Sequence, residues 1–417
     1  MIFAKKGFKN LYYGWVMVAV SGMIFFFSAP GQTYSISVFI DTMPFDVSQT
    51  TVSLFYSAAT LLSGISLLWM GRLIDRLGHR KMTLIVASGL GVVLLINSTV
   101  GSFLIFGFSF FFLRFFGQGS MTLIPSSLVP QWFEKNKATA LSIAQIGGLL
   151  ATLLIPLVNV WVIGTFGWSQ AWRIWAAAIG FIFIPVIFLT LVNKPADLNL
   201  LIENKDPQDA KTIRLEDDRI KRQSLSLKDA INVREFWILG FVSMIPSMFT
   251  TGMTFHIYTL MRLRGILEPQ AALLIGLLAF PALFMPILAK TVIDRFQLKW
   301  SISLPLLGII AAMALLNALT GFTSALIFMI AYGSVIAVLQ LSLNVSWPYY
   351  FGRYHLGSIR GAATVFMVIG SAFGPLPFGI SYDLTGEYTS VILGMMVFTA
   401  LTWLFTLTLR KTRMHAR

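Results

Sequence analysis

The chain has 417 residues, of which 56% are hydrophobic and only 12% are charged. A soluble protein carries about 25% charged residues because much of its surface must be polar, so this composition excludes a soluble fold and indicates a membrane protein. The chain has no cysteine, which excludes disulfides and Cys-ligated metal sites. Its four histidines do not favour a His-carboxylate metal site either, and no metal or cofactor is expected.

Apolar segments without charged residues recur along the whole chain. Each is long enough for the roughly 20 residues that a membrane-spanning helix needs. A transmembrane β-barrel would instead show alternating segments of about 10 residues, which the sequence lacks. The sequence therefore predicts an all-α membrane protein with twelve transmembrane helices, at about 12–40, 50–70, 82–101, 103–130, 138–163, 169–193, 236–260, 268–290, 301–320, 322–348, 358–381 and 387–409.

The first apolar segment is far longer than the about 7–15 apolar residues of a secretory signal peptide, so we expect a retained helix. Many segments also contain proline. In a membrane bundle proline kinks a helix rather than excluding it, because neighbouring helices re-satisfy the freed carbonyl groups. We expect kinks at Pro30, Pro125, Pro156, Pro185, Pro246, Pro286, Pro305 and Pro375.

Basic residues are distributed unevenly among the predicted loops. If the N-terminus is inside, all of the 31 Lys and Arg residues except Arg114, Arg173, Arg262 and Arg264 lie in cytoplasmic segments. Cytoplasmic loops carry such an excess, so we expect a multi-pass protein of the cell (cytoplasmic) membrane with both termini in the cytoplasm. This bias also accounts for the net charge of +14 without a nucleic-acid partner, because the basic residues are spread over many short loops.

One polar segment, 194–235, interrupts the series of apolar segments and holds nine basic and nine acidic residues. We interpret it as a cytoplasmic linker between an N-terminal six-helix bundle, 1–193, and a C-terminal six-helix bundle, 236–417. Near its end, Ser226 followed by Asp229 resembles a capping box, which predicts a short helix there.

The second half of the sequence repeats features of the first. Ile146-Gly147 in "KATALSIAQIGG" and Ile369-Gly370 in "RGAATVFMVIGS" are separated by 223 residues, and each pair follows a basic residue at the same spacing. Asp75-Arg76 and Asp294-Arg295 are separated by 219 residues. Two such similar offsets indicate a duplication. Two six-helix repeats related by an axis along the membrane normal are typical of one class of secondary transporters.

Several motifs resemble the major facilitator superfamily, and the resemblance covers the whole chain. "GRLIDRLGHRK", 71–81, is similar to the signature loop between helices 2 and 3 of that superfamily, and "RFFGQG", 114–119, is similar to its helix 4 motif. Further segments resemble the monocarboxylate and oxalate-formate porter branch: "YYGWVMV", "TYSISVFID", "REFWIL" and "YFGRYHLGSIRG".

The resemblance implies a gate at the cytoplasmic end. Asp75 would cap and pair across the boundary between the two halves when the inside is closed, and the glycines would permit tight turns and close helix approach. The alternative is a solvated loop whose basic residues only orient the chain. The candidate gate residues are Gly71, Asp75, Arg76, Gly78, Arg80, Asp294 and Arg295.

Arg114 is a charged residue deep within a predicted span, and burying it is costly unless it has partners or faces water. It either binds an anionic substrate or braces backbone carbonyl groups of helix 1. Gln118 follows four residues later, on the same helical face. Gln32, Gln340 and Asn344 lie on polar stripes of helices 1 and 10, where they either contact substrate or bridge helices.

The eleventh span reads G-x8-G-x3-G-P-x3-G and resembles the superfamily's antiporter motif, which is normally in helix 5. We interpret it as tight packing and a bend, not as evidence of exchange. Its residues are Gly361, Gly370, Gly374, Pro375 and Gly379.

No residue set suggests an enzyme, and there is no nucleotide-binding G-x-x-x-x-G-K-[ST] motif. We expect a secondary active or facilitative transporter that moves a small, monocarboxylate-like organic anion by alternating access. The alternatives are efflux of hydrophobic or cationic compounds, suggested by the 36 Phe residues, and a non-transporting membrane sensor. The expected partners are a small solute and the lipid bilayer. The sequence leaves open whether an ion is co-transported or exchanged. We expect a monomer. The acidic and basic residues that the porter branch uses in helices 1, 8 and 11 are absent, so its coupling mechanism does not carry over.

Overall fold

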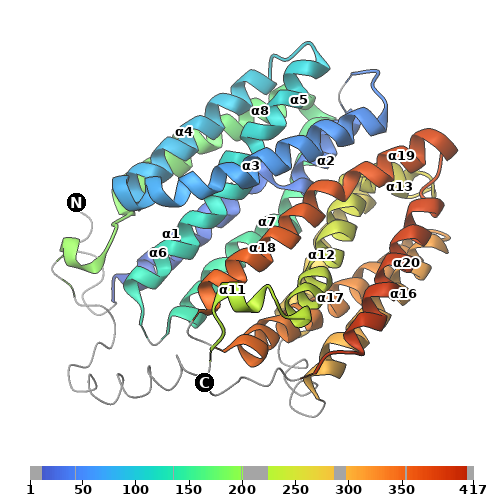
Figure 1. The fold of residues 1–417 in the computed structure, drawn as a ribbon. Helices are drawn as coiled ribbons and strands as arrows, with labels where there is room; N and C mark the ends of the chain where they lie inside the picture. The colour runs from blue at the N-terminus through green and yellow to red at the C-terminus, as the bar shows by residue number, and fades with distance from the viewer. Residues whose placement is uncertain are drawn as a thin grey trace. The chain divides into compact units, whose positions relative to one another are not determined.

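The computed structural model describes residues 12–42, 44–134, 136–198, 200, 224–285, 297–352 and 355–410. In these ranges the regular structure is helical (Figure 1). The chain divides into two compact units, Met1–Asp206 and Pro207–Arg417. Each unit is described by itself below.

The first unit contains six long helical segments, three of which are interrupted. In chain order they are α1 (Gly14–Phe27) with the 3-10 turn η2 (Ala29–Gly31) and α2 (Thr33–Thr42); α3 (Gln49–Leu77); α4 (His79–Asn97); α5 (Phe103–Phe112) with the π-helical η3 (Leu113–Ser120) and α6 (Met121–Trp132); α7 (Lys137–Phe166); and α8 (Trp168–Ala178) with the π-helical η4 (Ile179–Phe183) and α9 (Ile184–Thr190). A short 3-10 turn, η5 (Pro195–Leu198), follows.

The second unit begins with a short helix and continues with long helical segments. They are α11 (Leu227–Ala230); α12 (Arg234–Phe255) with α13 (Ile257–Arg262); α14 (Glu268–Ala279) with the 3-10 turn η7 (Phe280–Leu283); α16 (Leu298–Asn317); α17 (Phe322–Phe351); α18 (Leu356–Phe373) with α19 (Pro375–Thr385); and α20 (Thr389–Thr406).

Within the described ranges, eleven helices are long and apolar enough to cross a membrane. They correspond to eleven of the twelve predicted spans. The remaining span, predicted at 268–290, appears as the shorter apolar helix Glu268–Leu283, and the part of it from 286 onward lies outside the described residues. The all-α membrane fold is therefore confirmed.

The predicted loop 71–81 is almost entirely helical. α3 ends at Leu77, seven residues beyond the predicted end of the second span, and α4 begins at His79. Gly78 alone makes the turn, with a φ of 80° that glycine adopts without steric cost. The prediction placed this end too early, because a helix extends beyond its apolar segment when polar residues carry it into the interfacial region.

Prolines interrupt only some of the helices. Pro30 lies in η2, between two helices of the first span, and Pro375 begins α19 directly after the end of α18. By contrast, Pro125, Pro156 and the prolines of α12 and α16 lie within continuous helices. Pro286 lies outside the described residues.

The same three pairs of helices pack together in both units. In the first unit α1 packs on α7, α3 on α5, and α4 on α8. In the second unit the corresponding pairs are α12 on α18, α14 on α17, and α16 on α20. The packing of each unit therefore follows the repeat that the sequence indicates.

Glycines at equivalent positions of the repeat make equivalent contacts. A Cβ atom on Gly147 of α7 would lie 2.0 Å from the carbonyl oxygen of Gly22 in α1. A Cβ atom on Gly370 of α18 would lie 2.6 Å from the carbonyl oxygen of Met244 in α12. The two Ile-Gly pairs that are 223 residues apart thus mark the same helix-helix contact in the two units.

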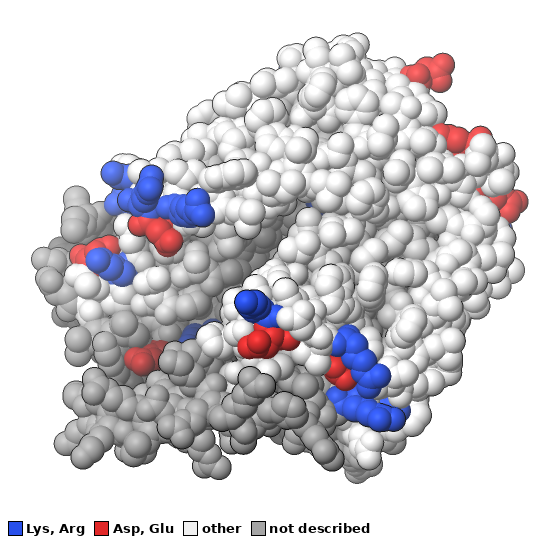
Figure 2. Space-filling view, in the orientation of Figure 1, with Lys and Arg blue, Asp and Glu red and all other residues white. Residues whose placement is uncertain are grey.

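The outer surfaces of the helices carry large apolar side chains. Phe181 is 84% exposed and Leu68 is 72% exposed. Figure 2 shows the helix flanks of the visible face without charged residues, which gather toward the helix ends. Such surfaces are expected of helices surrounded by lipid, because lipid solvates apolar side chains.

The short helix predicted in the linker is present. Ser226 is the N-cap residue of α11, and its Oγ accepts a hydrogen bond from the backbone N–H of Asp229 at 3.3 Å. The same hydroxyl donates to Asp229 Oδ2 at 2.6 Å, as a capping pair would. Residues 201–223 of the predicted linker lie outside the described residues.

Candidate functional site

Two interruptions of regular helix face each other in the first unit. The 3-10 turn η2 in the first span packs against the π-helical η3 in the fourth. The contact is possible because both sides are glycine: a Cβ atom on Gly31 would lie 2.7 Å from the Cα atom of Gly117 and 2.2 Å from the carbonyl oxygen of Leu113. Irregular backbone at membrane depth is tolerated only inside protein or beside a water-filled cavity, and π-helical turns are frequent at functional sites.

The interruption of the first span creates a new helix N-terminus within it. Gln32 has an extended backbone, and its carbonyl oxygen accepts the first hydrogen bonds of α2, from the N–H groups of Ser35 and Ile36 at 3.0 Å. The N–H groups of Thr33 and Tyr34 come before any intrahelical acceptor. This end of α2 therefore carries the partial positive charge of the helix dipole.

Arg114 lies in η3 beside this N-terminus. The residue is only 4% exposed. Nη1 donates to the hydroxyl of Thr33 at 3.3 Å, and the guanidinium carbon is 4.9 Å from the centre of the Tyr56 ring. The hydroxyl groups of Thr33 and Tyr56 are 2.7 Å apart. A guanidinium, two hydroxyl groups and a helix N-terminus thus meet at one place in the first unit.

The contacts described above for Arg114 are with Thr33 and Tyr56, and Gln118 is not among them. Residues 113–120 are π-helical, so Arg114 and Gln118 stand four positions apart on a π-helical rather than an α-helical turn. Gln118 is half-buried, and its Oε1 atom is buried without a hydrogen-bond partner in the described part of the chain. Gln32 is also half-buried, and its Nε2 donates to Ser28 Oγ at 3.0 Å.

A second polar chain holds α2 against α7 and α8. Asn159 of α7 donates from Nδ2 to Ser35 Oγ at 2.9 Å and accepts from Trp175 Nε1 at 2.8 Å. All three residues are buried. These contacts position the N-terminal turn of α2, and they assign Ser35 a helix-bridging role.

Gln340 and Asn344, the two candidates of the tenth span, belong to the second unit, whereas Arg114 belongs to the first. Gln340 is half-buried on α17. Asn344 is exposed, and its Oδ1 accepts a hydrogen bond from Arg360 of α18. For Asn344 the described contact is therefore a bridge between helices.

The candidate gate residues differ in their surroundings. Asp75 and Arg76 are exposed. Arg80 is held inside its own unit: its backbone N–H donates to Asn193 Oδ1 at 2.9 Å, and its guanidinium donates to the Phe188 carbonyl and lies 4.9 Å from the centre of the Phe188 ring. These contacts account for Arg80 without a gate. Asp294 and Arg295 lie outside the described residues.

Two gate glycines also differ. A Cβ atom on Gly78 would lie 2.9 Å from Asn193 Oδ1, so this turn is packed as well as left-handed. A Cβ atom on Gly71 would meet nothing within 4 Å. Close approach to a neighbouring helix within its own unit therefore does not explain Gly71.

Part of the glycine motif of the eleventh span makes the tight packing and the bend that were expected. Gly370 and Gly374 pack against the backbone of α12, where a Cβ atom on Gly374 would lie 2.3 Å from the Met248 carbonyl oxygen. Pro375 forms the break between α18 and α19, and Gly379 is buried. Gly361 has open space around a built Cβ atom, so the packing interpretation does not extend to it.

The sequence did not single out Thr33 or Tyr56. Their hydroxyl groups lie 23 residues apart in the sequence, and Arg114 follows Thr33 by 81 residues. Pro30-Gly31 was the available signal for a break just before Thr33. Nothing in the sequence indicated that this break would face Arg114.

A bundle of membrane-spanning helices, with interrupted helices around a buried basic side chain, is the arrangement of a secondary transporter. The chain belongs to the Major Facilitator Superfamily, whose family model matches residues 14–375. It is therefore a multi-pass membrane transporter and not an enzyme, and its family implies a small-molecule solute.

One curated relative shares part of the sequence. A stretch of 173 residues is 30% identical to the riboflavin transporter RibJ of Trypanosoma cruzi (strain CL Brener). That match spans 39% of this chain and 36% of the length of the relative.

Several solved transporters share the fold along nearly the whole chain. The nucleoside transporter NupG is similar at a TM-score of 0.73 and 12% identity, covering 95% of this chain and 100% of that one. The D-xylose-proton symporter is similar at 0.70 and 16%, covering 97% and 99%. A bacterial homolog of the human lysosomal transporter Spinster is similar at 0.70 and 14%, covering 96% of each chain. These identities show the fold alone and leave the branch of the family open.

Proposed function

We propose that this transporter moves a small, monocarboxylate-like organic anion by alternating access, in a secondary active or facilitative mode. The observation that carries the proposal is the position of the Arg114 guanidinium beside the N-terminus of α2. A guanidinium binds a carboxylate through two parallel hydrogen bonds, and a helix N-terminus offers free N–H groups to the same anion.

Electrostatics favours an anion at this place. The guanidinium and the positive end of α2 both lower the free energy of a negative charge between them. Thr33 and Tyr56 add hydroxyl groups that can donate to a carboxylate oxygen. Gln32 and Thr33 are half-buried rather than fully buried, which is consistent with access for a solute.

The competing interpretation is that Arg114 only braces the fourth span against the first through Thr33. Under that interpretation the solute would belong to a different class, such as a hydrophobic or cationic compound that is exported, or a neutral solute. The names of the similar proteins include nucleoside, sugar and riboflavin transporters, so a panel of solutes must include neutral compounds.

The test uses purified protein in proteoliposomes and radiolabelled monocarboxylates, with a nucleoside, a sugar and riboflavin in parallel. Hydrogen bonds to charged groups contribute about 1.5–3 kcal/mol, so Arg114→Gln should lower the apparent affinity for the anion roughly 10- to 100-fold. Arg114→Lys keeps the charge but loses the two parallel hydrogen bonds of the guanidinium. Its affinity for the anion should lie between those of the unaltered protein and of Arg114→Gln. The matched control is Arg173→Gln, which removes an exposed arginine of α8.

Thermal unfolding separates a ligand from a brace, because binding raises the stability of the folded state. If Arg114 binds the anion, Arg114→Gln abolishes the stabilisation by organic acids, measured at two pH values, and changes the ligand-free protein little. A large loss of stability without ligand, with stabilisation by the acid retained, would overturn the proposal. Anion uptake by Arg114→Gln equal to the unaltered protein would overturn it as well.

We further infer the setting in which this transport takes place. The distribution of basic residues supports a cell-membrane location with both termini cytoplasmic and six helices on each side of the segment 194–235. The repeat supports two halves that rock about a central site, with Asp75 and Asp294 in matched cytoplasmic gates of a monomeric transporter. Single cysteines in this cysteine-free chain would test the orientation with membrane-impermeant thiol reagents.

A further inference from the structure

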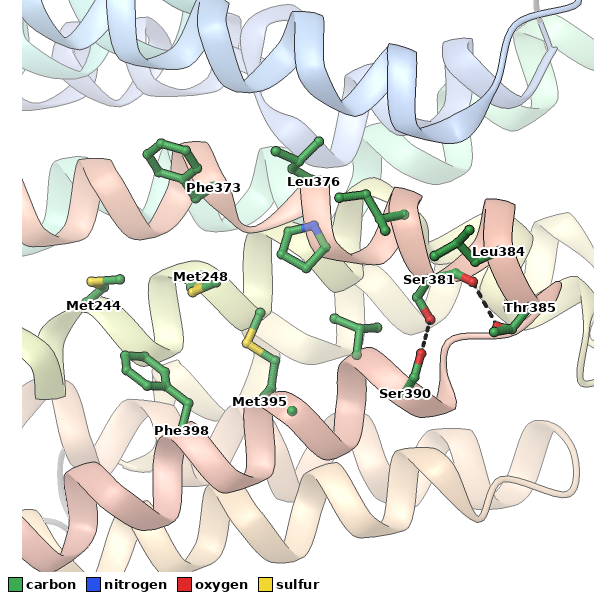
Figure 3. A pocket seen from close by; sticks show the side chains of 14 residues that line it. Met244, Met248, Phe373, Leu376, Ser381, Leu384, Thr385, Ser390, Met395 and Phe398 are labelled. Carbon is green, nitrogen blue, oxygen red and sulfur yellow. Dashed lines mark hydrogen bonds between the residues drawn. The ribbon is translucent and has the colours of Figure 1, made fainter.

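The second unit contains a groove between three of its membrane-spanning segments. It is bounded by α12, by α18 with α19, and by α20, and has a volume of about 700 Å³ (Figure 3). The break at Gly374-Pro375 changes the course of the eleventh span beside the groove, and Gly394 leaves a gap in the wall formed by α20. None of the candidate transport or gate residues that the structure describes lines it.

The groove is apolar along most of its length. Met244 and Met248 of α12 form its floor, and Phe373 and Phe398 line it at the end away from the α19–α20 turn (Figure 3). Methionine side chains are flexible and polarizable, so they adapt to an irregular apolar ligand.

Polar groups are concentrated at the opposite end. Ser381 Oγ and Ser390 Oγ are 2.7 Å apart, and Ser381 also donates to the Glu387 carbonyl oxygen at 2.8 Å (Figure 3). The Thr385 hydroxyl donates to the Ser381 carbonyl oxygen at 2.8 Å. This end adjoins the turn where α19 ends and α20 begins, which is the depth at which spanning helices reach lipid headgroups.

The length of the groove matches one leaflet. Ser390 and Phe398 are eight residues apart on α20, a rise of roughly 12 Å along the helix axis. The hydrocarbon core of a bilayer is about 30 Å thick, so each leaflet contributes about half of it. A chain that enters at the polar end would therefore extend through most of one leaflet.

We propose that the groove between α12, α18–α19 and α20 binds one acyl chain of a membrane phospholipid, with the lipid headgroup at the α19–α20 turn. Leu384 at this end is 79% exposed and Ile380 is 41% exposed, so apolar side chains border the opening. Helices Leu356–Thr385 and Thr389–Thr406 are both long and apolar enough to span a membrane, so a groove along them lies at the depth of the lipid chains.

The first experiment fills the groove. Gly394→Phe places a ring where a Cβ atom would meet nothing within 4 Å, so it occupies the groove without a backbone clash. Gly164→Phe is the matched control, because Gly164 is an exposed helical glycine of α7 that also has open space. After detergent washing, native mass spectrometry should show one phospholipid fewer on Gly394→Phe than on the unaltered protein or the control. Equal lipid retention by all three proteins would overturn the proposal.

The second experiment needs no bulky substitution. A single cysteine at Gly394, or at Gly164 as control, is the sole labelling site because the chain has no other cysteine. With a bimane label, a phospholipid that carries a chain nitroxide should quench the Gly394 label to saturation at low lipid fractions. The Gly164 label should be quenched only in proportion to the lipid fraction. Proportional quenching at both positions means that lipid only collides with the groove, and would refute a bound chain. Neither readout involves transport, so both stand apart from the proposed anion site.

Discussion

Gly31 and Gly117 lie backbone to backbone, so that a Cβ atom on either one would come within 2.7 Å of the Cα atom of the other. This contact joins the 3-10 turn of the first span to the π-helical part of the fourth and brings Thr33 to Arg114. The candidate site therefore depends on two residues that have no side chain.

Alanine at Gly31 or Gly117 should destabilise the protein, because the obstacle is backbone that cannot rotate away. Forcing extra methyl groups into packed protein costs about 1–3 kcal/mol, so we expect a lower midpoint of thermal unfolding and weaker anion uptake. Gly164→Ala is the control, since nothing lies within 4 Å of its built Cβ atom. A Gly31→Ala protein as stable as Gly164→Ala would contradict the close contact.

Thr33 should matter through its hydroxyl. Thr33→Val keeps the shape but removes the hydroxyl that bonds to both Arg114 and Tyr56, so we expect about 1–3 kcal/mol of lost stability. Because Arg114 is then less firmly oriented, we also expect a lower anion affinity. Thr42→Val is the control on the same helix, because among the described residues that hydroxyl bonds to two carbonyl groups of its own helix. Uptake kinetics and thermal unfolding would measure both variants. Equal behaviour of the two would show that the Thr33 hydroxyl does not orient Arg114.

The repeated glycine contacts should respond alike in the two units. Gly147→Ala and Gly370→Ala each place a methyl group against a backbone carbonyl oxygen, at 2.0 and 2.6 Å, and should each lower stability by about 1–3 kcal/mol. Gly148 is adjacent to Gly147, yet its built Cβ atom is 3.7 Å from the Phe25 side chain, an ordinary contact. Gly148→Ala should therefore be nearly neutral in thermal unfolding. A loss confined to one unit would argue against equivalent packing.

Two glycines near the α3–α4 turn test different roles: Gly78 a local structural role, and Gly71 a role in the proposed gate. Gly78→Ala combines a φ of 80° with a crowded Cβ atom, and should destabilise the protein by about 1–2 kcal/mol or more. Gly71→Ala has no such cost within its own unit. If Gly71 serves the proposed gate, Gly71→Ala should unfold normally but transport more slowly. Normal transport by Gly71→Ala would remove Gly71 from the gate.

Removing the charge of Asp75 tests its proposed role in the gate. Asp75 is exposed, and within the described parts of its unit its carboxylate has no ion-pair partner within 4 Å. Exposed ion pairs contribute about 0.2–1 kcal/mol, so Asp75→Asn should slow transport up to about fivefold, and less at high salt, with unchanged solute affinity. Asp46→Asn, at an exposed acid on a connecting segment, is the control. Rates that match those of Asp46→Asn at low salt would leave Asp75 without a gating role.

Much of the helix series could be predicted from the sequence, because backbone groups in lipid must bond within their own segment and apolar length alone marks each span. Helix ends were less predictable: α3 continues through Arg72 and Asp75, which an apolar window excludes. The capping of α11 was readable because Ser226 and Asp229 are three residues apart and interact locally.

The candidate site was predicted only in part. Arg114 was identified because a charge in an apolar segment is conspicuous, and Pro30 marked a place where a helix can break. The π-helical turn at 113–120 was not predicted, because nothing local in "RFFGQG" announces such a turn.

By itself, the sequence determined that this chain is an all-helical membrane protein, and it indicated two similar halves, because hydropathy and repeated motifs are properties of short stretches. Only the tertiary structure decided which groups surround Arg114, where the helices are interrupted, and that a groove opens beside Gly394. The physical reason is that these features arise from contacts between helices whose residues are tens to more than a hundred positions apart, and the closeness of such residues depends on packing that no local pattern encodes.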